Sequence, residues 1–214
     1  MNTVFERIQA VGILPVIALD DAAQAVPLAR ALAAGGIPAA EVTFRTAAGE
    51  EAIRRIAQEC PDILVGAGTV LTTDQVDRAV NAGAGFIVSP GTNPKVVRHC
   101  REAGVQAVPG VVTPTEIETA LELGVDVLKF FPAEPSGGLN MIKALAAPYT
   151  QVRFIPTGGI SAANAGEYLR YPKILACGGS WMVKKDLVNA GKFDEIQKLA
   201  AEAAAIVKAV REGN

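Results

Sequence analysis

The stretch Val125-Asp-Val-Leu-Lys-Phe-Phe-Pro132 has the composition of a buried β-strand. Gly124 precedes it, a proline closes it, and most residues between are apolar and either β-branched or aromatic. Because side chains along a strand alternate between its two faces, Lys129 points to the face opposite Leu128 and Phe130. The stretch therefore predicts an interior strand with one lysine in the middle of it.

Lys129 is the first candidate for chemistry in the chain. Burying an unpaired ammonium is costly, so a buried lysine tends to lose its proton. The neutral amine is the form that attacks a ketone and forms a Schiff base. The alternative is that the aliphatic stem packs in the interior while the ammonium reaches water at the end of the strand.

The same strand-then-helix pattern recurs along the chain after an amphipathic helix over residues 2–12. The strands are expected at residues 13–19, 39–44, 63–70, 85–90, 106–112, 125–132, 152–157 and 174–179. The helices are expected at about residues 21–35, 47–60, 73–83, 93–104, 114–124, 139–148, 161–168 and 193–211. The expected helix caps are Asp20 or Asp21, Thr72 or Thr73, Asn93, Thr113 and Ser161.

Eight strand–helix units, spaced by roughly 20–25 residues, indicate parallel strands joined by helical crossovers. Eight such units close into a (β/α)₈ or TIM barrel, and 214 residues is at the compact end of that fold. We therefore predict an α/β fold in which residues 1–214 form a single TIM-barrel domain with an extra N-terminal helix. The alternative, a doubly wound open sheet, usually has a glycine-rich first turn, whereas the first turn here is Ala18-Leu-Asp-Asp21.

The composition argues against several classes of partner. The net charge of −2 is not that of a chain that binds nucleic acid or an anionic membrane through a basic face. The three cysteines form neither an even disulfide set nor a C-x-x-C pair, so we expect reduced thiols in a cytoplasmic protein. The sequence shows no signal-peptide pattern and no apolar stretch long enough to span a bilayer, so we predict no membrane association.

His99 is the only histidine, and it falls in a helical pattern that places it on the outer ring. A Ser-His-Asp triad or a histidine-ligated metal is therefore not expected. No cluster of carboxylates or cysteines resembles a metal site either, and we predict no metal. Chemistry at neutral pH is then left to lysine, glutamate or threonine.

The second strand carries the clearest polar residues. In TIM barrels the chemistry lies at the carboxyl ends of the strands. If Val42 and Phe44 face the helices, then Glu41, Thr43 and Arg45 share the inner face. Polar and charged side chains inside a barrel are costly without partners or a task. The alternative is a structural ion pair between the glutamate and the arginine.

Glycine pairs follow the seventh and eighth strands. The seventh strand ends Pro156-Thr-Gly-Gly-Ile-Ser161 and the eighth ends Cys177-Gly-Gly-Ser180. In TIM barrels, glycine turns at these two places bind phosphate through backbone N–H groups and a helix amino end. Although a tight turn alone can also require glycine, two such turns predict an anion site. Thr69, at the end of the third strand, belongs to the same rim.

Six motifs, in chain order, resemble those of one family. They are Glu41-Val-Thr-Phe-Arg-Thr46, Gly66-Ala-Gly-Thr69, Ser89-Pro-Gly91, Lys129-Phe-Phe-Pro-Ala-Glu134, Pro156-Thr-Gly-Gly-Ile160 and Gly178-Gly-Ser-Trp181. Over nearly the whole chain, the sequence resembles the class I 2-keto-3-deoxy-6-phosphogluconate (KDPG) aldolases, also called 4-hydroxy-2-oxoglutarate (KHG) aldolases. Phe44 is a small departure, because the family pattern leads us to expect leucine there.

The resemblance implies reversible cleavage of KDPG to pyruvate and D-glyceraldehyde 3-phosphate, and of 4-hydroxy-2-oxoglutarate to pyruvate and glyoxylate. It implies that Lys129 forms the Schiff base and that Glu41 is the general acid and base. The other implied substrate contacts are Arg45 and Thr69 at the carboxylate, Pro90 and Phe131 beside the lysine, and Thr157, Gly158, Gly159, Gly179 and Ser180 at the phosphate. The family also implies a homotrimer, and no cofactor beyond the covalent intermediate.

Three other functions remain open from the sequence. One is an aldolase for the C4-epimeric phosphogalactonate keto acid. Another is a sugar-phosphate isomerase or epimerase, which needs two acid–base groups where only Glu41 presents itself. The third is a non-catalytic assembly subunit on the same scaffold. Reduction by borohydride in the presence of pyruvate distinguishes a Schiff-base aldolase from the last two.

Overall fold

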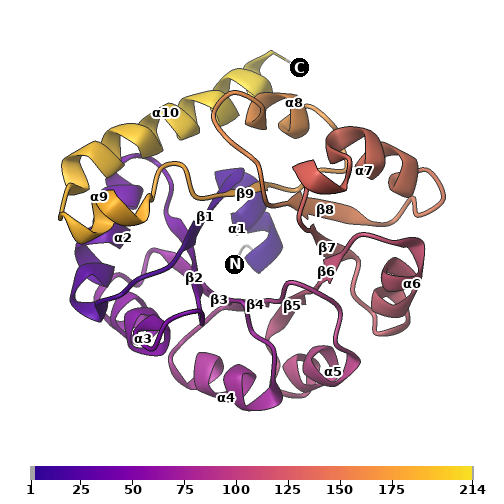
Figure 1. Cartoon of the computed structure of the whole chain (residues 1–214), viewed down its shortest axis with the longest axis horizontal. Coiled ribbons are helices and arrows are strands. Elements are labelled where there is room, and N and C mark those ends of the chain that lie inside the picture. Colours follow the sequence, from indigo (N-terminus) through magenta and orange to yellow (C-terminus); the bar gives the residue numbers. More distant parts are fainter. Residues whose placement is uncertain (1–2, 214) are drawn as a thin grey trace.

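A ring of parallel strands lies inside a ring of helices in the computed structural model, which describes residues 3–213 (Figure 1). The strands are β1 (Ile13–Ile17), β2 (Ala39–Thr43), β3 (Leu64–Gly68), β4 (Phe86–Val88), β5 (Gln106–Val108), β6 (Gly110–Val111), β7 (Val127–Phe130), β8 (Arg153–Pro156) and β9 (Cys177–Gly179). Pro109, which has no N–H to donate, separates β5 from β6. These two strands therefore share one position of the ring, and eight positions result.

Backbone pairing follows the order of the chain around the ring. One sheet has the order β5-β4-β3-β2-β1-β9 and the other has the order β6-β7-β8. The sheets meet at Pro109 on one side, and the bridges Phe154–Ile174 and Thr157–Gly178 join β8 to the chain around β9 on the other. The prediction of a TIM barrel is thus confirmed, and the carboxyl ends of all strands lie at one rim.

The outer helices begin and end close to the predicted boundaries. They are η1 (Ala22–Gln24), α2 (Ala25–Ala34), α3 (Gly49–Glu59), α4 (Thr73–Asn81), α5 (Pro94–Glu102), α6 (Pro114–Glu122), η2 (Glu134–Ser136), α7 (Gly138–Ala146), α8 (Ala165–Leu169), α9 (Lys185–Asn189) and α10 (Phe193–Glu212). Thr72, Asn93 and Thr113 cap their helices as predicted. Among residues 3–213, no helix has the length and hydrophobicity needed to cross a bilayer.

Two helix predictions need correction. Ser161 does not cap a helix, because α8 begins only at Ala165 and is five residues long. The short helix α9 was not predicted, since its five residues are too few for a helical period to stand out. The N-terminal helix α1 runs over Val4–Val11, with a capping box between Thr3 and Glu6. The first predicted residue of that helix, residue 2, lies outside the described residues.

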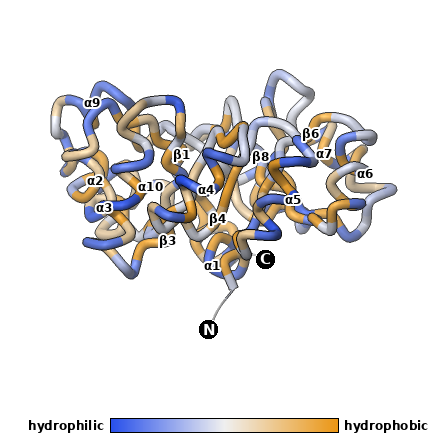
Figure 2. Tube along the Cα trace, turned by 90° about the horizontal axis from the view of Figure 1, so that it is seen from below, coloured by the Kyte–Doolittle hydropathy of each residue, from blue (hydrophilic) through white to orange (hydrophobic). Residues whose placement is uncertain are grey.

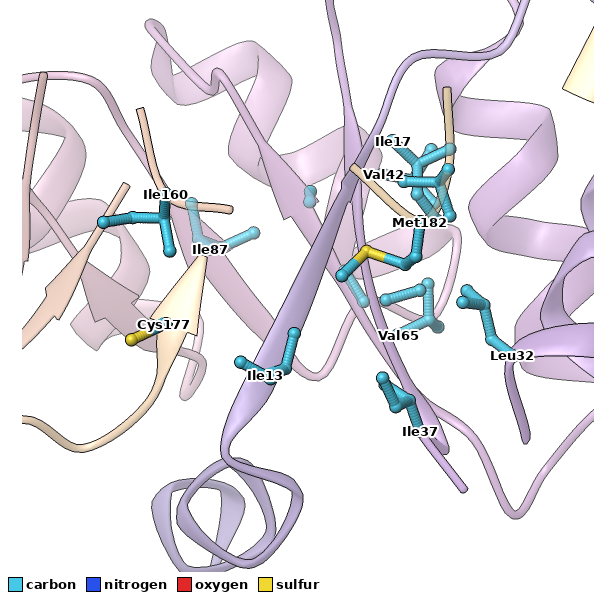
Figure 3. Close-up of a cluster of buried hydrophobic side chains, with 14 of the residues drawn as sticks. Ile13, Ile17, Leu32, Ile37, Val42, Val65, Ile87, Ile160, Cys177 and Met182 are labelled. Atoms are coloured by element: carbon cyan, nitrogen blue, oxygen red, sulfur yellow. The ribbon is translucent and has the colours of Figure 1, made fainter. Parts of the chain in front are cut away.

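An apolar layer fills the space between the strands and the helices. Ile17, Val42 and Val65 of three neighbouring strands join Leu32 of α2 in this layer (Figure 3). All four side chains are buried. The hydrophobic segments therefore gather toward the strands, with hydrophilic ones on the outside (Figure 2). Burial of this layer is the main favourable term that holds the helices on the ring.

A second apolar cluster fills the interior of the barrel at the amino ends of the strands. Leu14, Leu64, Phe86 and Val127 contribute to it, and Ile8 of α1 packs against them. Helix α1 lies across the middle of the ring in Figure 1 and below it in Figure 2. Since α1 closes this end, polar side chains inside the barrel have room only at the carboxyl ends.

The filling of the interior leads to a prediction about Gly66. A methyl group at this glycine would lie 2.4 Å from ring atoms of Phe86. Because overpacking of a dense core typically costs about 1–3 kcal/mol, we expect Gly66→Ala to lower the free energy of unfolding by that amount. Gly91→Ala is the control, since nothing lies within 4 Å of the added methyl group. Equal urea midpoints for the two variants would contradict this account of the interior.

Candidate active site

A cavity of about 320 Å³ opens at the carboxyl ends of the strands. It is lined by Val16, Glu41, Arg45, Thr69, Pro90, Lys129, Phe131, Thr157, Gly158, Gly159, Ile160, Gly178, Gly179 and Ser180. Every residue predicted from the sequence to contact substrate is among them. Val16, Ile160 and Gly178 were not predicted, because an apolar residue or a glycine carries no chemical signal of its own in a sequence.

Lys129 and Glu41 form an ion pair in the interior of the barrel. The distance from Lys129 Nζ to Glu41 Oε1 is 3.3 Å, and the two residues are only 6% and 1% exposed. The alternative in which the ammonium reaches water at the strand end is therefore wrong. The amine also lies 5.2 Å from the centre of the Phe131 ring, which adds a cation–π contact while it is charged.

Room for the Glu41 carboxylate depends on Gly68 in the neighbouring strand. The strands β2 and β3 pair in register, with Glu41 opposite Gly66 and Thr43 opposite Gly68. A methyl group added at Gly68 would lie 2.3 Å from Glu41 Oε1. The glycine of this strand thus allows the carboxylate to lie alongside it and reach Lys129.

Arg45 takes its position from a chain of hydrogen bonds rather than from Glu41. Its Nε donates to Thr43 Oγ1 over 3.2 Å, and that hydroxyl donates to the carbonyl of Ile17 over 2.9 Å. Glu41 is paired with Lys129 instead, so the predicted alternative of a structural Glu41–Arg45 ion pair is wrong. Thr43 is buried but does not line the cavity, and its role is to support the guanidinium.

The glycine turns after β8 and β9 form another part of the cavity wall. Thr157 and Gly178 are bridged, and a methyl group at Gly178 would lie 2.2 Å from Thr157 Oγ1. Because α8 begins only at Ala165, the turn after β8 faces the cavity without the helix amino end that the sequence predicts. Any anion recognition by this turn must therefore come from its own N–H groups.

Thr69 has an unusual backbone conformation. Its φ of +57° lies in the left-handed region, and it is the only non-glycine residue among residues 3–213 with a positive φ. A β-branched residue in this region is strained, and such strain gathers at functional sites. Thr69 follows β3 directly and lines the cavity.

Two further findings concern groups outside the cavity. His99 lies on the outer ring as predicted, where its Nε2 is 2.7 Å from Asp77 Oδ1. The hydrogen bond to that carboxylate raises the pKa of the imidazole. Within residues 3–213, no group of three or more His, Cys, Asp or Glu side chains is arranged to hold a metal ion.

Comparison of the chain with known proteins shows which family it is similar to. The family model described as "Aldolase: KDPG and KHG aldolase" matches residues 4–199. The chain belongs to this family. A Treponema pallidum protein named 2-dehydro-3-deoxy-phosphogluconate aldolase is 54% identical over 207 residues, which cover 97% of this chain and 99% of that protein. The predicted family is thus confirmed.

Solved structures of family members show the same fold. A KDPG aldolase from Legionella pneumophila, with pyruvate captured as a covalent carbinolamine intermediate, has a TM-score of 0.90 at 37% identity, over 94% of this chain and 97% of that one. A 2-keto-3-deoxy-6-phosphogluconate aldolase from Zymomonas mobilis, with 3-phosphoglycerate, has a TM-score of 0.87 at 42% identity, over 95% and 96%.

The strain at Thr69 has a measurable signature. At ordinary backbone angles glycine is less stable than alanine, by roughly 0.5–1 kcal/mol in regular structure. In the left-handed region the order reverses, because alanine retains a penalty of about 1–2 kcal/mol that glycine avoids. We expect Thr69→Gly to unfold at a higher urea concentration than Thr69→Ala, although both variants lack the hydroxyl. The opposite order would mean that Thr69 is not held in this conformation.

Proposed function

We propose that this chain is a class I aldolase that reversibly cleaves KDPG to pyruvate and D-glyceraldehyde 3-phosphate, and 4-hydroxy-2-oxoglutarate to pyruvate and glyoxylate. The observation that carries the proposal is the buried amine of Lys129, 3.3 Å from the Glu41 carboxylate, in a cavity of a KDPG and KHG aldolase family member. A lysine amine that is within reach of both a ketone and a proton acceptor can form a Schiff base.

Substrate binding begins with the keto-acid end. Arg45, held by Thr43, lines the cavity together with Thr69, and a guanidinium can bind a carboxylate through two parallel hydrogen bonds. We assign the substrate carboxylate to Arg45 and Thr69, which brings C2 of the substrate to Lys129. Pro90 and Phe131 form the wall beside the amine.

Bond cleavage then proceeds through the lysine. Glu41 takes the proton of the Lys129 ammonium, and the neutral amine attacks C2. Return of this proton to the carbinolamine hydroxyl expels water and leaves a cationic iminium. This cationic nitrogen accepts the electron pair of the C3–C4 bond, so Glu41, through a water molecule, removes the proton of the C4 hydroxyl as the aldehyde leaves. The resulting enamine takes a proton back at C3 from Glu41. Water hydrolyses the iminium and releases pyruvate, so the amine is regenerated.

The phosphate end of the substrate is assigned to the opposite group of lining residues, Thr157, Gly158, Gly159, Gly179 and Ser180. These are hydroxyl and backbone groups at the carboxyl ends of the neighbouring strands β8 and β9 and in the turns that follow them. Binding energy gained there, far from the reacting bond, can be used to orient C2 and C4. The Zymomonas mobilis structure contains 3-phosphoglycerate, a phosphorylated three-carbon compound like the proposed aldehyde product.

We further propose that residues 1–214 form one domain that works in the cytoplasm as a homotrimer. The 97% coverage of the chain by the Treponema pallidum relative supports the single domain, the resemblance to the family supports the homotrimer, and the three free cysteines support the cytoplasm. The reaction requires no metal or organic cofactor, because the iminium on Lys129 is itself the electron sink. The expected partner is therefore a small keto acid.

Trapping with borohydride tests the assignment of Lys129. Reduction of the iminium with pyruvate bound leaves a secondary amine that cannot hydrolyse, so we expect a mass increase on Lys129 in the parent protein. Lys129→Ala should lose both labelling and cleavage, whereas Lys198→Ala, which changes an exposed residue of α10, should retain both. Labelling of a different lysine would refute the assignment of Lys129, and no labelling at all would refute the proposal and favour the non-catalytic alternative.

The role of Arg45 is separable from stability. Because hydrogen bonds to charged groups contribute about 1.5–3 kcal/mol, Arg45→Ala should raise KM for both keto acids at least about tenfold. We expect the melting temperature to change little, since Glu41 remains paired with Lys129 in this variant. An unchanged KM together with a large fall in melting temperature would instead show that Arg45 is structural.

A further inference from the structure

The turn over residues 158–161 has almost no regular structure to hold it. It leaves β8 with two glycines in the left-handed region, at φ values of +99° for Gly158 and +84° for Gly159, and it ends before α8 begins. Gly158, Gly159 and Ile160 nevertheless line the cavity. A wall made of mobile backbone would bind an anion poorly, because ordering the turn on binding costs conformational entropy.

Three successive carbonyl groups, those of Thr157, Gly158 and Gly159, face the protein. The carbonyl of Thr157 accepts from the N–H of Ala133 over 2.8 Å, and that of Gly158 accepts from the N–H of Glu134 over 3.0 Å. The carbonyl of Gly159 accepts from the side chain of Asn164, whose Nδ2 lies 3.1 Å away. The third of these bonds is the only one made by a side chain.

This arrangement determines where the N–H groups point. In a trans peptide the C=O and N–H bonds point in opposite directions, so the N–H groups of Gly159 and Ile160 point away from Glu134 and Asn164. Among residues 3–213, neither of these two N–H groups has a protein acceptor. Two successive free N–H groups on a cavity wall can both donate to one anion.

Asn164 fixes both ends of the turn at once. Its Oδ1 accepts from the N–H of Ser161 over 2.8 Å while its Nδ2 donates to Gly159, so the peptide planes on either side of Ile160 are both held. Asn164 does not line the cavity. It lines a neighbouring cavity behind the turn, together with Glu134 and Tyr168, whose side chains are hydrogen-bonded to each other.

We propose that Asn164 is a positioning residue that holds the N–H groups of Gly159 and Ile160 toward the phosphate of the substrate. The inference rests on the proposed aldolase function, and it adds a residue that never touches the substrate. It predicts that Asn164 affects phosphorylated and unphosphorylated substrates differently, whereas a residue that only stabilises the fold would affect both equally.

The test compares two substrates in Asn164→Ala and Asn164→Asp. We expect KM for KDPG and the inhibition constant for inorganic phosphate to rise about tenfold, equivalent to about 1.4 kcal/mol, with little change for 4-hydroxy-2-oxoglutarate. Asn164→Asp keeps an acceptor for the Ser161 N–H but places a carboxylate oxygen next to the Gly159 carbonyl oxygen, which repels it. The aspartate variant should therefore show the same loss as Asn164→Ala. Asn140→Ala is the control, since Asn140 lines the same rear cavity and makes no side-chain bond to the turn.

The outcomes separate this inference from the proposed function. Equal losses on both substrates, unchanged phosphate inhibition, or full rescue by Asn164→Asp would overturn the role of Asn164. Borohydride trapping of pyruvate should remain unchanged in the Asn164 variants, because pyruvate has no phosphate and its carboxylate is assigned to Arg45 and Thr69. Absence of trapping in the parent protein would instead overturn the proposed function itself, whatever the Asn164 variants do.

Discussion

The ion pair between Lys129 and Glu41 is the constraint on which the rest of the site depends. Each charge is nearly inaccessible to water, so each relies on the other and on its immediate neighbours for solvation. Removing one partner of such a pair leaves a buried charge without compensation, which costs several kcal/mol. The barrel therefore has to hold both side chains in one geometry, and it does so by placing them on strands rather than on loops.

The distribution of side-chain size inside the barrel follows from this constraint. At the amino ends of the strands, Phe86 and Ile8 fill the interior, and no polar group is needed. At the carboxyl ends, the side chains of Glu41 and Thr157 fill the space that a side chain at Gly68 or Gly178 would need. The small residues in these strands are thus part of the site, although they carry no functional group.

The alternation of side chains along strands was enough to predict the charged residues of the candidate site, whereas most of the other lining residues came from the resemblance to the family. Lys129 and Glu41 are polar residues in apolar strands, so their direction followed from period two alone, whereas Arg45 lies just beyond β2 and is held by Thr43. The partner of Glu41 could not be predicted, because both Arg45 and Lys129 could pair with its carboxylate and only the packed structure shows that Lys129 does. The functional roles of these residues, as distinct from their positions, remain predictions.

Turns were predicted less well than strands, for a physical reason. The sequence Ser161-Ala-Ala-Asn164 contains two residues that can cap a helix, and local pattern alone favours the first. In the structure, Asn164 instead folds back on the turn and bonds to Gly159 and Ser161. The start of the turn is held from a distant part of the chain, since the N–H groups of Ala133 and Glu134, after β7, donate to the carbonyls of Thr157 and Gly158.

The two ends of the cavity therefore differ in how they can change. The end at Lys129 depends on an ion pair between two strands, where substitution of either partner leaves a buried charge without compensation. The other end combines hydroxyls with two backbone N–H groups, those of Gly159 and Ile160, whose direction is set by a residue outside the cavity. Because the orienting side chain never contacts the substrate, this end can be altered for a different aldehyde while the Schiff-base chemistry stays intact. A division of this kind separates recognition of the pyruvate half from recognition of the leaving half.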